Sequence, residues 1–184
     1  MDNNCVLTFV VGVSGVGKTE LIRRFVAKHH EFRHLEASKL IREGLNAKKL
    51  EQIKFLPKEQ IIKNQSILLE GLLEYKQKCH HIILDGHLLI NNNQELVKIP
   101  LDVVRGIAPH NMVLVTGNPH DIILHRTNDL HRKRHSQTAT EIEEIQNNIK
   151  HTAIAYCKEL GIRFDTLDFT EYKRFRNLLT QDGQ

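Results

Sequence analysis

The chain has 184 residues, of which 40% are hydrophobic and 26% charged, as in an ordinary soluble globular protein. No apolar run is long enough to cross a bilayer, and the start of the chain lacks the charge pattern of a signal peptide, so a membrane or secreted protein is not expected. The formal net charge of +4 suits a polyanionic ligand but is too small to indicate nucleic acid.

Three cysteines, Cys5, Cys79 and Cys157, lie far apart in the sequence and have no metal-ligand spacing. We expect them to be reduced thiols, as in a cytoplasmic protein.

The first half of the chain alternates between strand and helix patterns. A nearly continuous aliphatic run predicts a buried strand over Cys5 to Val11. A glycine-rich loop follows it, and apolar residues at helical spacing then predict a helix over Glu20 to His30. A short helix is expected over Ser38 to Glu43, and a longer one over Lys58 to Lys78.

The second half continues the alternation. Strands are expected over His81 to Leu84, Met112 to Val115 and Ile162 to Leu167, and helices over His120 to Asn128 and Thr140 to Leu160, where Gly161 ends the helix. The alternation predicts a parallel sheet with helices on both faces. No repeat, low-complexity tract or linker divides the chain, so residues 1–184 are expected to form one domain.

Residues 12–19, which we call the glycine loop, fit the phosphate-loop pattern G-x-x-x-x-G-K-[ST] at every fixed position. Glycines let successive backbone N–H groups converge on phosphate oxygens, and the following helix turns its positive end toward the same anion. A turn that binds nothing is disfavoured, because a strand precedes the loop and an amphipathic helix follows it. Lys18 is expected to reach the β- and γ-phosphates during catalysis, and the Thr19 hydroxyl to bind Mg²⁺. The nucleotide-binding residues predicted are Gly12, Ser14, Gly15, Val16, Gly17, Lys18, Thr19 and Glu20.

Asp85 follows the second buried strand, in the stretch HIILDGHLL. A carboxylate at this position suits Mg²⁺ or its water shell, because Mg²⁺ prefers oxygen ligands. The alternative is an ordinary Asp-Gly turn at the end of a strand. Two interpretations of His87 stay open, a contact with the acceptor phosphate or packing in a crevice.

A basic segment, ILHRTNDLHRKRH, contains Arg126, Arg132 and Arg134. Arginines suit the negative charge that phosphoryl transfer spreads over the equatorial oxygens, and a mobile segment carrying them would exclude water. A solvated basic helix face is the second interpretation. An RNA contact is the third, which the lack of an aromatic residue within the segment disfavours.

Three segments together resemble nucleoside monophosphate kinases of the phosphate-loop superfamily, and archaeal-type adenylate kinases in particular: GVSGVGKT, ILDGH and HRTNDLHRKRHSQTATEIEEIQ. The last segment resembles the family's lid, here about residues 126–140, in which Arg126, Arg132 and Arg134 would be catalytic. The resemblance implies a three-layer α/β/α sandwich with a five-stranded parallel sheet, and transfer of the ATP γ-phosphate to a nucleoside monophosphate with Mg²⁺. A homo-oligomer or a protein partner is also compatible with it.

The acceptor side of the resemblance lies in EASKLIREG and in the helices of about residues 37–79. Carried over from the family, Ser38 would lie near the acceptor base or ribose, and Arg42 would bind its phosphate, with Asp85 and His87 alongside. Longer adenylate kinases follow Asp-Gly with Phe-Pro-Arg, whereas this chain has His87-Leu88-Leu89.

Two functions follow as hypotheses. The first is an enzyme that converts ATP and a nucleoside monophosphate, AMP foremost, into two diphosphates. The alternative is a regulatory or assembly module that binds ATP or GTP, hydrolyses it slowly and acts on a protein or RNA partner.

Overall fold

A computed structural model describes residues 5–45, 56–92, 95–128 and 137–180. Its centre is a five-stranded sheet in the order β2-β3-β1-β6-β7, in which every neighbouring pair is parallel. The strands are β1 (Val6–Val11), β2 (Phe32–Glu36), β3 (His81–Asp85), β6 (Asn111–Thr116) and β7 (Arg163–Asp168). The predicted α/β fold with a five-stranded parallel sheet is therefore confirmed.

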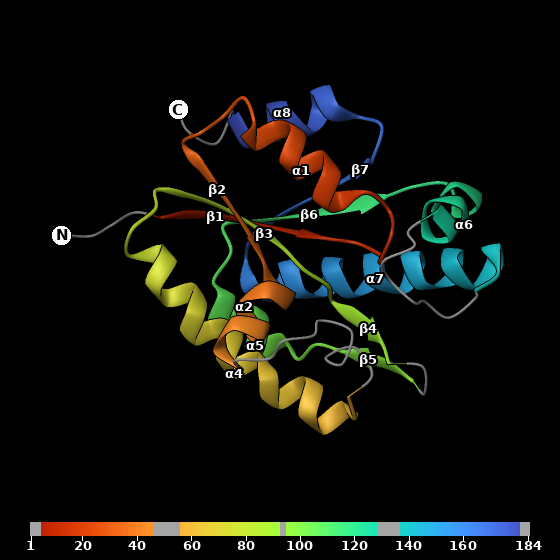
Figure 1. Cartoon of the computed structure of the whole chain (residues 1–184), viewed down its shortest axis with the longest axis horizontal. Coiled ribbons are helices and arrows are strands. Elements are labelled where there is room, and N and C mark those ends of the chain that lie inside the picture. The colour runs from red at the N-terminus through yellow and green to blue at the C-terminus, as the bar shows by residue number, and fades with distance from the viewer. Residues whose placement is uncertain (1–4, 46–55, 93–94, 129–136, 181–184) are drawn as a thin grey trace.

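Helices cover both faces of this sheet (Figure 1). On one face lie α1 (Lys18–Val26) and α8 (Tyr172–Thr180), and on the other lie α2 (Ala37–Gly44), α4 (Lys58–Lys76), α5 (Leu101–Ile107) and α7 (Ala139–Leu160). The helix α6 (Pro119–Asn128) follows β6 and contacts α7. None of the helices in the described ranges is both long and apolar enough to span a bilayer.

The core lies between the sheet and these two helix layers. The central strands β1, β3 and β6 bury aliphatic side chains completely, among them Leu7, Val10, Ile83 and Val113. A strand covered on both faces is apolar at nearly every position. For this reason the three central strands could be predicted from the sequence.

The edge strand β2 was not predicted. Its sequence is FRHLE, and only Leu35 is fully buried. An edge strand pairs on one side only, so polar residues are tolerated and the continuous apolar run is missing. The antiparallel hairpin of β4 (Leu89–Asn91) and β5 (Leu96–Lys98) and the helices α5 and α8 were also not predicted.

The ends of α1 and α7 can be compared with the helix ends expected from the sequence. The first helix ends at Val26, four residues before the expected His30. The long helix α7 has Thr138 as N-cap in a capping box with Glu141, and it ends at Gly161, which adopts a left-handed conformation with φ 66° as expected.

Candidate nucleotide-binding site

The candidate site lies at the carboxyl ends of the central strands, where ligands of open parallel sheets bind. The glycine loop follows β1, and the strand register pairs Val10 with Asp85 on β3 and Val11 with Leu114 on β6. The fold therefore brings the glycine loop beside Asp85 and the loop after β6.

The glycine loop needs glycine for two separate reasons. At Gly12 a Cβ atom would come within 2.4 Å of the Val115 carbonyl oxygen, which belongs to the backbone of β6. Gly15 and Gly17 have φ of 89° and 104°, a region that glycine enters without strain. Gly17 is also the N-cap of α1 and provides no side-chain cap, so the first N–H groups of this helix are available to an anion.

Lys18 lies inside this loop and is only 5% exposed. Its Nζ donates to the carbonyl oxygens of Gly12 at 3.0 Å and Val13 at 3.2 Å. These two hydrogen bonds hold the ammonium group inside the glycine loop. A phosphate oxygen bound by the loop would replace one of the two carbonyl oxygens as its acceptor.

Thr19 and Asp85, the two predicted Mg²⁺ ligands, are in direct contact. The Thr19 hydroxyl donates to Asp85 Oδ2 at 2.6 Å, and Asp85 is buried. The described residues hold no group of three or more His, Cys, Asp or Glu placed to bind a metal ion. A hydroxyl beside one carboxylate fits Mg²⁺ all the same, because this ion is commonly bound by one or two protein oxygens together with substrate phosphates.

Two histidines border this pair. His87 Nδ1 lies 2.9 Å from the Gly12 carbonyl oxygen, so it donates to the glycine loop. His34 Nε2 lies 3.9 Å from Asp85 Oδ2. Burial lowers the pKa of His34 below its ordinary value of 6.5. The negative charges of Asp85 and Glu36 raise this pKa, but by less than burial lowers it, so the imidazole is neutral at pH 7.

Of the three arginines of the predicted lid, Arg126 lies within the described residues. Its Nε donates to the Ser14 carbonyl oxygen at 2.8 Å, and its guanidinium also donates to Gln137 Oε1 at 2.6 Å. A cation from the end of α6 therefore reaches the glycine loop across 112 residues of sequence. Arg132 and Arg134 lie outside the described residues.

The other predicted residues occupy the periphery. Glu20 is exposed on the first turn of α1. Ser38 and Arg42 are half-buried on α2, whose first residue follows Glu36, the strand partner of Asp85. The beginning of α2 thus lies next to Asp85, and Arg42 lies a turn further along the helix.

Gln146 is a contributor to the site that the sequence did not reveal. From α7, its side-chain amide forms two hydrogen bonds with Gly117, accepting from the backbone N–H at 3.0 Å and donating to the carbonyl at 3.0 Å. A Cβ on Gly117 would lie 3.2 Å from Val16 and 3.3 Å from Phe169, so this glycine packs against both residues. Gln146 therefore fixes the loop after β6 against the glycine loop.

Phe169 was also missed. It follows β7, packs against Gly17 and meets the His125 ring edge to face with centroids 5.5 Å apart. Its backbone N–H donates to the Thr116 carbonyl at 2.9 Å.

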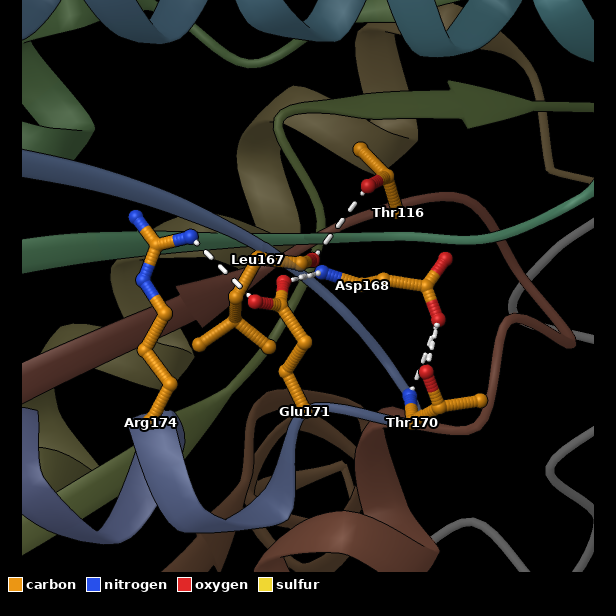
Figure 2. Close-up of polar contacts among 6 residues, drawn as sticks. All are labelled: Thr116, Leu167, Asp168, Thr170, Glu171 and Arg174. Atoms are coloured by element: carbon orange, nitrogen blue, oxygen red, sulfur yellow. Dashed lines mark hydrogen bonds and ion pairs between the residues drawn. The ribbon is translucent and has the colours of Figure 1, made fainter.

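Figure 2 shows the polar contacts that hold the segment around Phe169. Asp168 Oδ1 accepts from the N–H and hydroxyl of Thr170 at 3.0 and 2.7 Å, and the Asp168 N–H donates to Glu171 Oε2 at 2.7 Å. The Asp-x-x-Glu spacing at the start of α8 resembles a helix N-terminus signal, which could have located this turn.

A family model described as an AAA domain matches residues 11–146, from the end of β1 into α7. The chain belongs to this AAA domain family. The match covers the glycine loop, Asp85, Arg126 and Gln146.

Curated relatives of this family member are adenylate kinases from archaea. The chain is 27% identical to the adenylate kinase of Pyrococcus furiosus and 26% identical to that of Thermococcus onnurineus, in each case over 82% of this chain and 79% of the relative. Among solved structures, the shikimate kinase from Bacteroides thetaiotaomicron has a similar fold, with a TM-score of 0.58, 13% identity, and coverage of 95% of this chain and 98% of that one. Family, relatives and fold together support a phosphate-loop kinase similar to nucleoside monophosphate kinases.

Proposed function

We propose that this protein transfers the γ-phosphoryl group of ATP to a nucleoside monophosphate, with AMP as the leading acceptor, in the cytoplasm. The observation that supports it best is the contact between Arg126 and the Ser14 carbonyl, since it brings a guanidinium from a later helix onto the loop that would hold the β- and γ-phosphates. A protein that only stores a nucleotide does not require this second cation.

The donor side would work by exchange of hydrogen-bond partners. Backbone N–H groups of the glycine loop and the start of α1 would bind the phosphates, and Lys18 would move from the Gly12 and Val13 carbonyls to phosphate oxygens. Arg126 would turn from the Ser14 carbonyl to the migrating group, joined by Arg132 and Arg134. Thr19 and Asp85 would hold Mg²⁺, which when bound neutralises phosphate charge.

The acceptor side would lie at α2 and the end of β3. Arg42 would bind the acceptor phosphate, Ser38 would lie near the ribose or base, and His87 would border both substrates. A phosphate oxygen of the acceptor is already a competent nucleophile, so no protein general base is needed. The acceptor helices of about residues 37–79 and the lid of about residues 126–140 would then be parts of one kinase domain.

A coupled assay of ADP formation tests the proposal. ATP and Mg²⁺ are supplied with AMP, dAMP, GMP, CMP, UMP or TMP in turn, and with shikimate as an acceptor that is not a nucleotide. We expect one or more monophosphates to raise ADP formation well above the rate with water alone. If none does, the regulatory nucleotide-binding alternative replaces the kinase.

Two variants assign the roles. Lys18→Ala should abolish transfer, while Lys28→Ala, which removes an exposed lysine just past the same helix, should retain it. Arg126→Ala should lower kcat by at least about 100-fold while changing ATP affinity far less, as expected of a group that acts in the transition state. Equal losses in kcat and ATP affinity would contradict that role.

A further inference from the structure

His34 on β2 carries a buried nitrogen without a hydrogen bond. Its side chain is only 12% exposed, and its Nε2 atom is inaccessible and has no hydrogen-bond partner. Leaving such a group unsatisfied costs on the order of 1–3 kcal/mol. An apolar ring of similar shape would avoid this cost, so the imidazole requires an explanation.

The neighbours of His34 place it at the candidate metal site. Parallel pairing of β2 with β3 sets Glu36 opposite Asp85, and His34 precedes Glu36 by two residues, on the same face of the strand. The Asp85 Oδ2 atom, which accepts the Thr19 hydroxyl at 2.6 Å, is the same atom that lies 3.9 Å from His34 Nε2.

The distance itself suggests what is missing. At 3.9 Å the two atoms are too far apart for a direct hydrogen bond. Nε2 is inaccessible while the Thr19 hydroxyl donates to Asp85, so a water that bridges the gap with two hydrogen bonds of about 2.8 Å would enter when Thr19 and Asp85 separate to bind an ion. Because Thr19 and Asp85 are the residues suited to Mg²⁺, a water in this place would lie in or beside the ion's hydration shell.

We propose that His34 is a positioning residue for the metal site, whose Nε2 atom hydrogen-bonds a water of the Mg²⁺ shell and thereby orients Asp85. The proposal rests on the Mg²⁺–ATP site of the proposed function, but it does not depend on which acceptor is used. Removing a residue that hydrogen-bonds to the ligands of a metal ion commonly lowers the affinity for the metal by about 10–100-fold.

The test measures how strongly Mg²⁺ strengthens ATP binding. The Kd of ATP is determined by calorimetry with EDTA and again with Mg²⁺, and the ratio of the two values reports the metal's contribution. For His34→Phe we expect this ratio to fall about tenfold or more, with the Kd in EDTA unchanged within about twofold. His34→Gln, which keeps a polar group at similar reach, should restore most of the ratio.

His81→Phe is the matched control. His81 lies at the opposite end of the neighbouring strand β3, where its ring packs on Phe32 with centroids 4.7 Å apart. This variant should keep the full ratio. Asp85→Asn should lose it, because it alters a proposed ligand.

Unfolding by urea, without metal or nucleotide, separates this role from a structural one. His34→Phe should be at least as stable as the parent protein, because it removes an unsatisfied nitrogen without opening a cavity. A less stable His34→Phe variant that retains the Mg²⁺ ratio would overturn the proposal.

The outcomes also separate this proposal from the proposed function. A full ratio in His34→Phe together with a lost ratio in Asp85→Asn would refute the role of His34 alone. A reduced ratio in His34→Phe, in a protein that phosphorylates no monophosphate, would support the role of His34 and refute the kinase.

Discussion

Gln146 offers the sharpest test of how the site is held together. Its amide forms both an accepting and a donating hydrogen bond with the backbone of Gly117, each at 3.0 Å. Replacing Gln146 with alanine removes both bonds and leaves two backbone groups in a partly buried loop without their partner. At about 1 kcal/mol per hydrogen bond, the free energy of unfolding should fall by about 2 kcal/mol.

The same substitution should weaken ATP binding. Gly117 packs against Val16 in the glycine loop and against Phe169. Without its hydrogen bonds to Gln146, the backbone of Gly117 is held less firmly, and its packing against the glycine loop is weakened. We expect urea unfolding to show the loss of stability, thermal unfolding to shift down by about 4–8 °C, and the Kd of ATP to rise.

Asn147→Ala is the matched control, because Asn147 is the exposed neighbour on the same helix and also carries an amide. It should change stability by about 0.5 kcal/mol or less. If both variants unfold at the same urea concentration, the two bonds to Gly117 contribute nothing measurable and the assigned role of Gln146 is wrong.

Two further predictions concern single atoms. Gly12→Ala should abolish ATP binding and destabilise the fold, because its Cβ would lie 2.4 Å from the Val115 carbonyl oxygen; Gly161→Ala, with φ 66° and nothing within 4 Å, should cost only about 1 kcal/mol in urea unfolding. Burial raises the pKa of Cys157 from 9.0 to about 11, so at pH 8 its alkylation should be about 100-fold slower in the folded protein than in urea. Because the folded state keeps a proton that the unfolded state releases, stability should also fall between about pH 9 and pH 11, and a flat urea midpoint over that range would contradict the shift.

The sequence predicted the parts of the fold that local patterns specify. Buried central strands read as aliphatic runs, and the glycine loop and the Gly161 helix end follow from backbone geometry that few residues other than glycine adopt readily. The edge strand β2 escaped because Leu35 is its only buried residue, so its sequence lacks the continuous apolar run of the central strands, and its pairing with β3 identifies it as a strand.

The site divides in the same way. Thr19 and Asp85 could be paired from the sequence, since each follows a recognisable strand and the carboxyl ends of parallel strands meet at one edge. Gln146 and His34 could not, because a glutamine in a helix and a histidine in a polar strand carry no pattern of their own. Their contacts with Gly117 and Asp85 exist only after residues 29 and 51 positions apart have been brought together by the fold.

Gln137 provides a last test, because it shares Arg126 with the glycine loop. Donors from Lys18, His87 and Arg126 all lie on carbonyl oxygens of residues 12–14, so nucleotide phosphates would compete with those carbonyls for the same donors. Gln137 accepts from the Arg126 guanidinium at 2.6 Å and keeps it near the loop during that exchange.

Gln137→Ala should therefore lower kcat by about tenfold, the equivalent of one hydrogen bond to a charged group, with the Kd of ATP within about twofold of the parent value. In an Arg126→Ala background the same change should have no further effect on kcat, because the two residues act through one contact. If the two losses multiply instead, Gln137 does not act through Arg126.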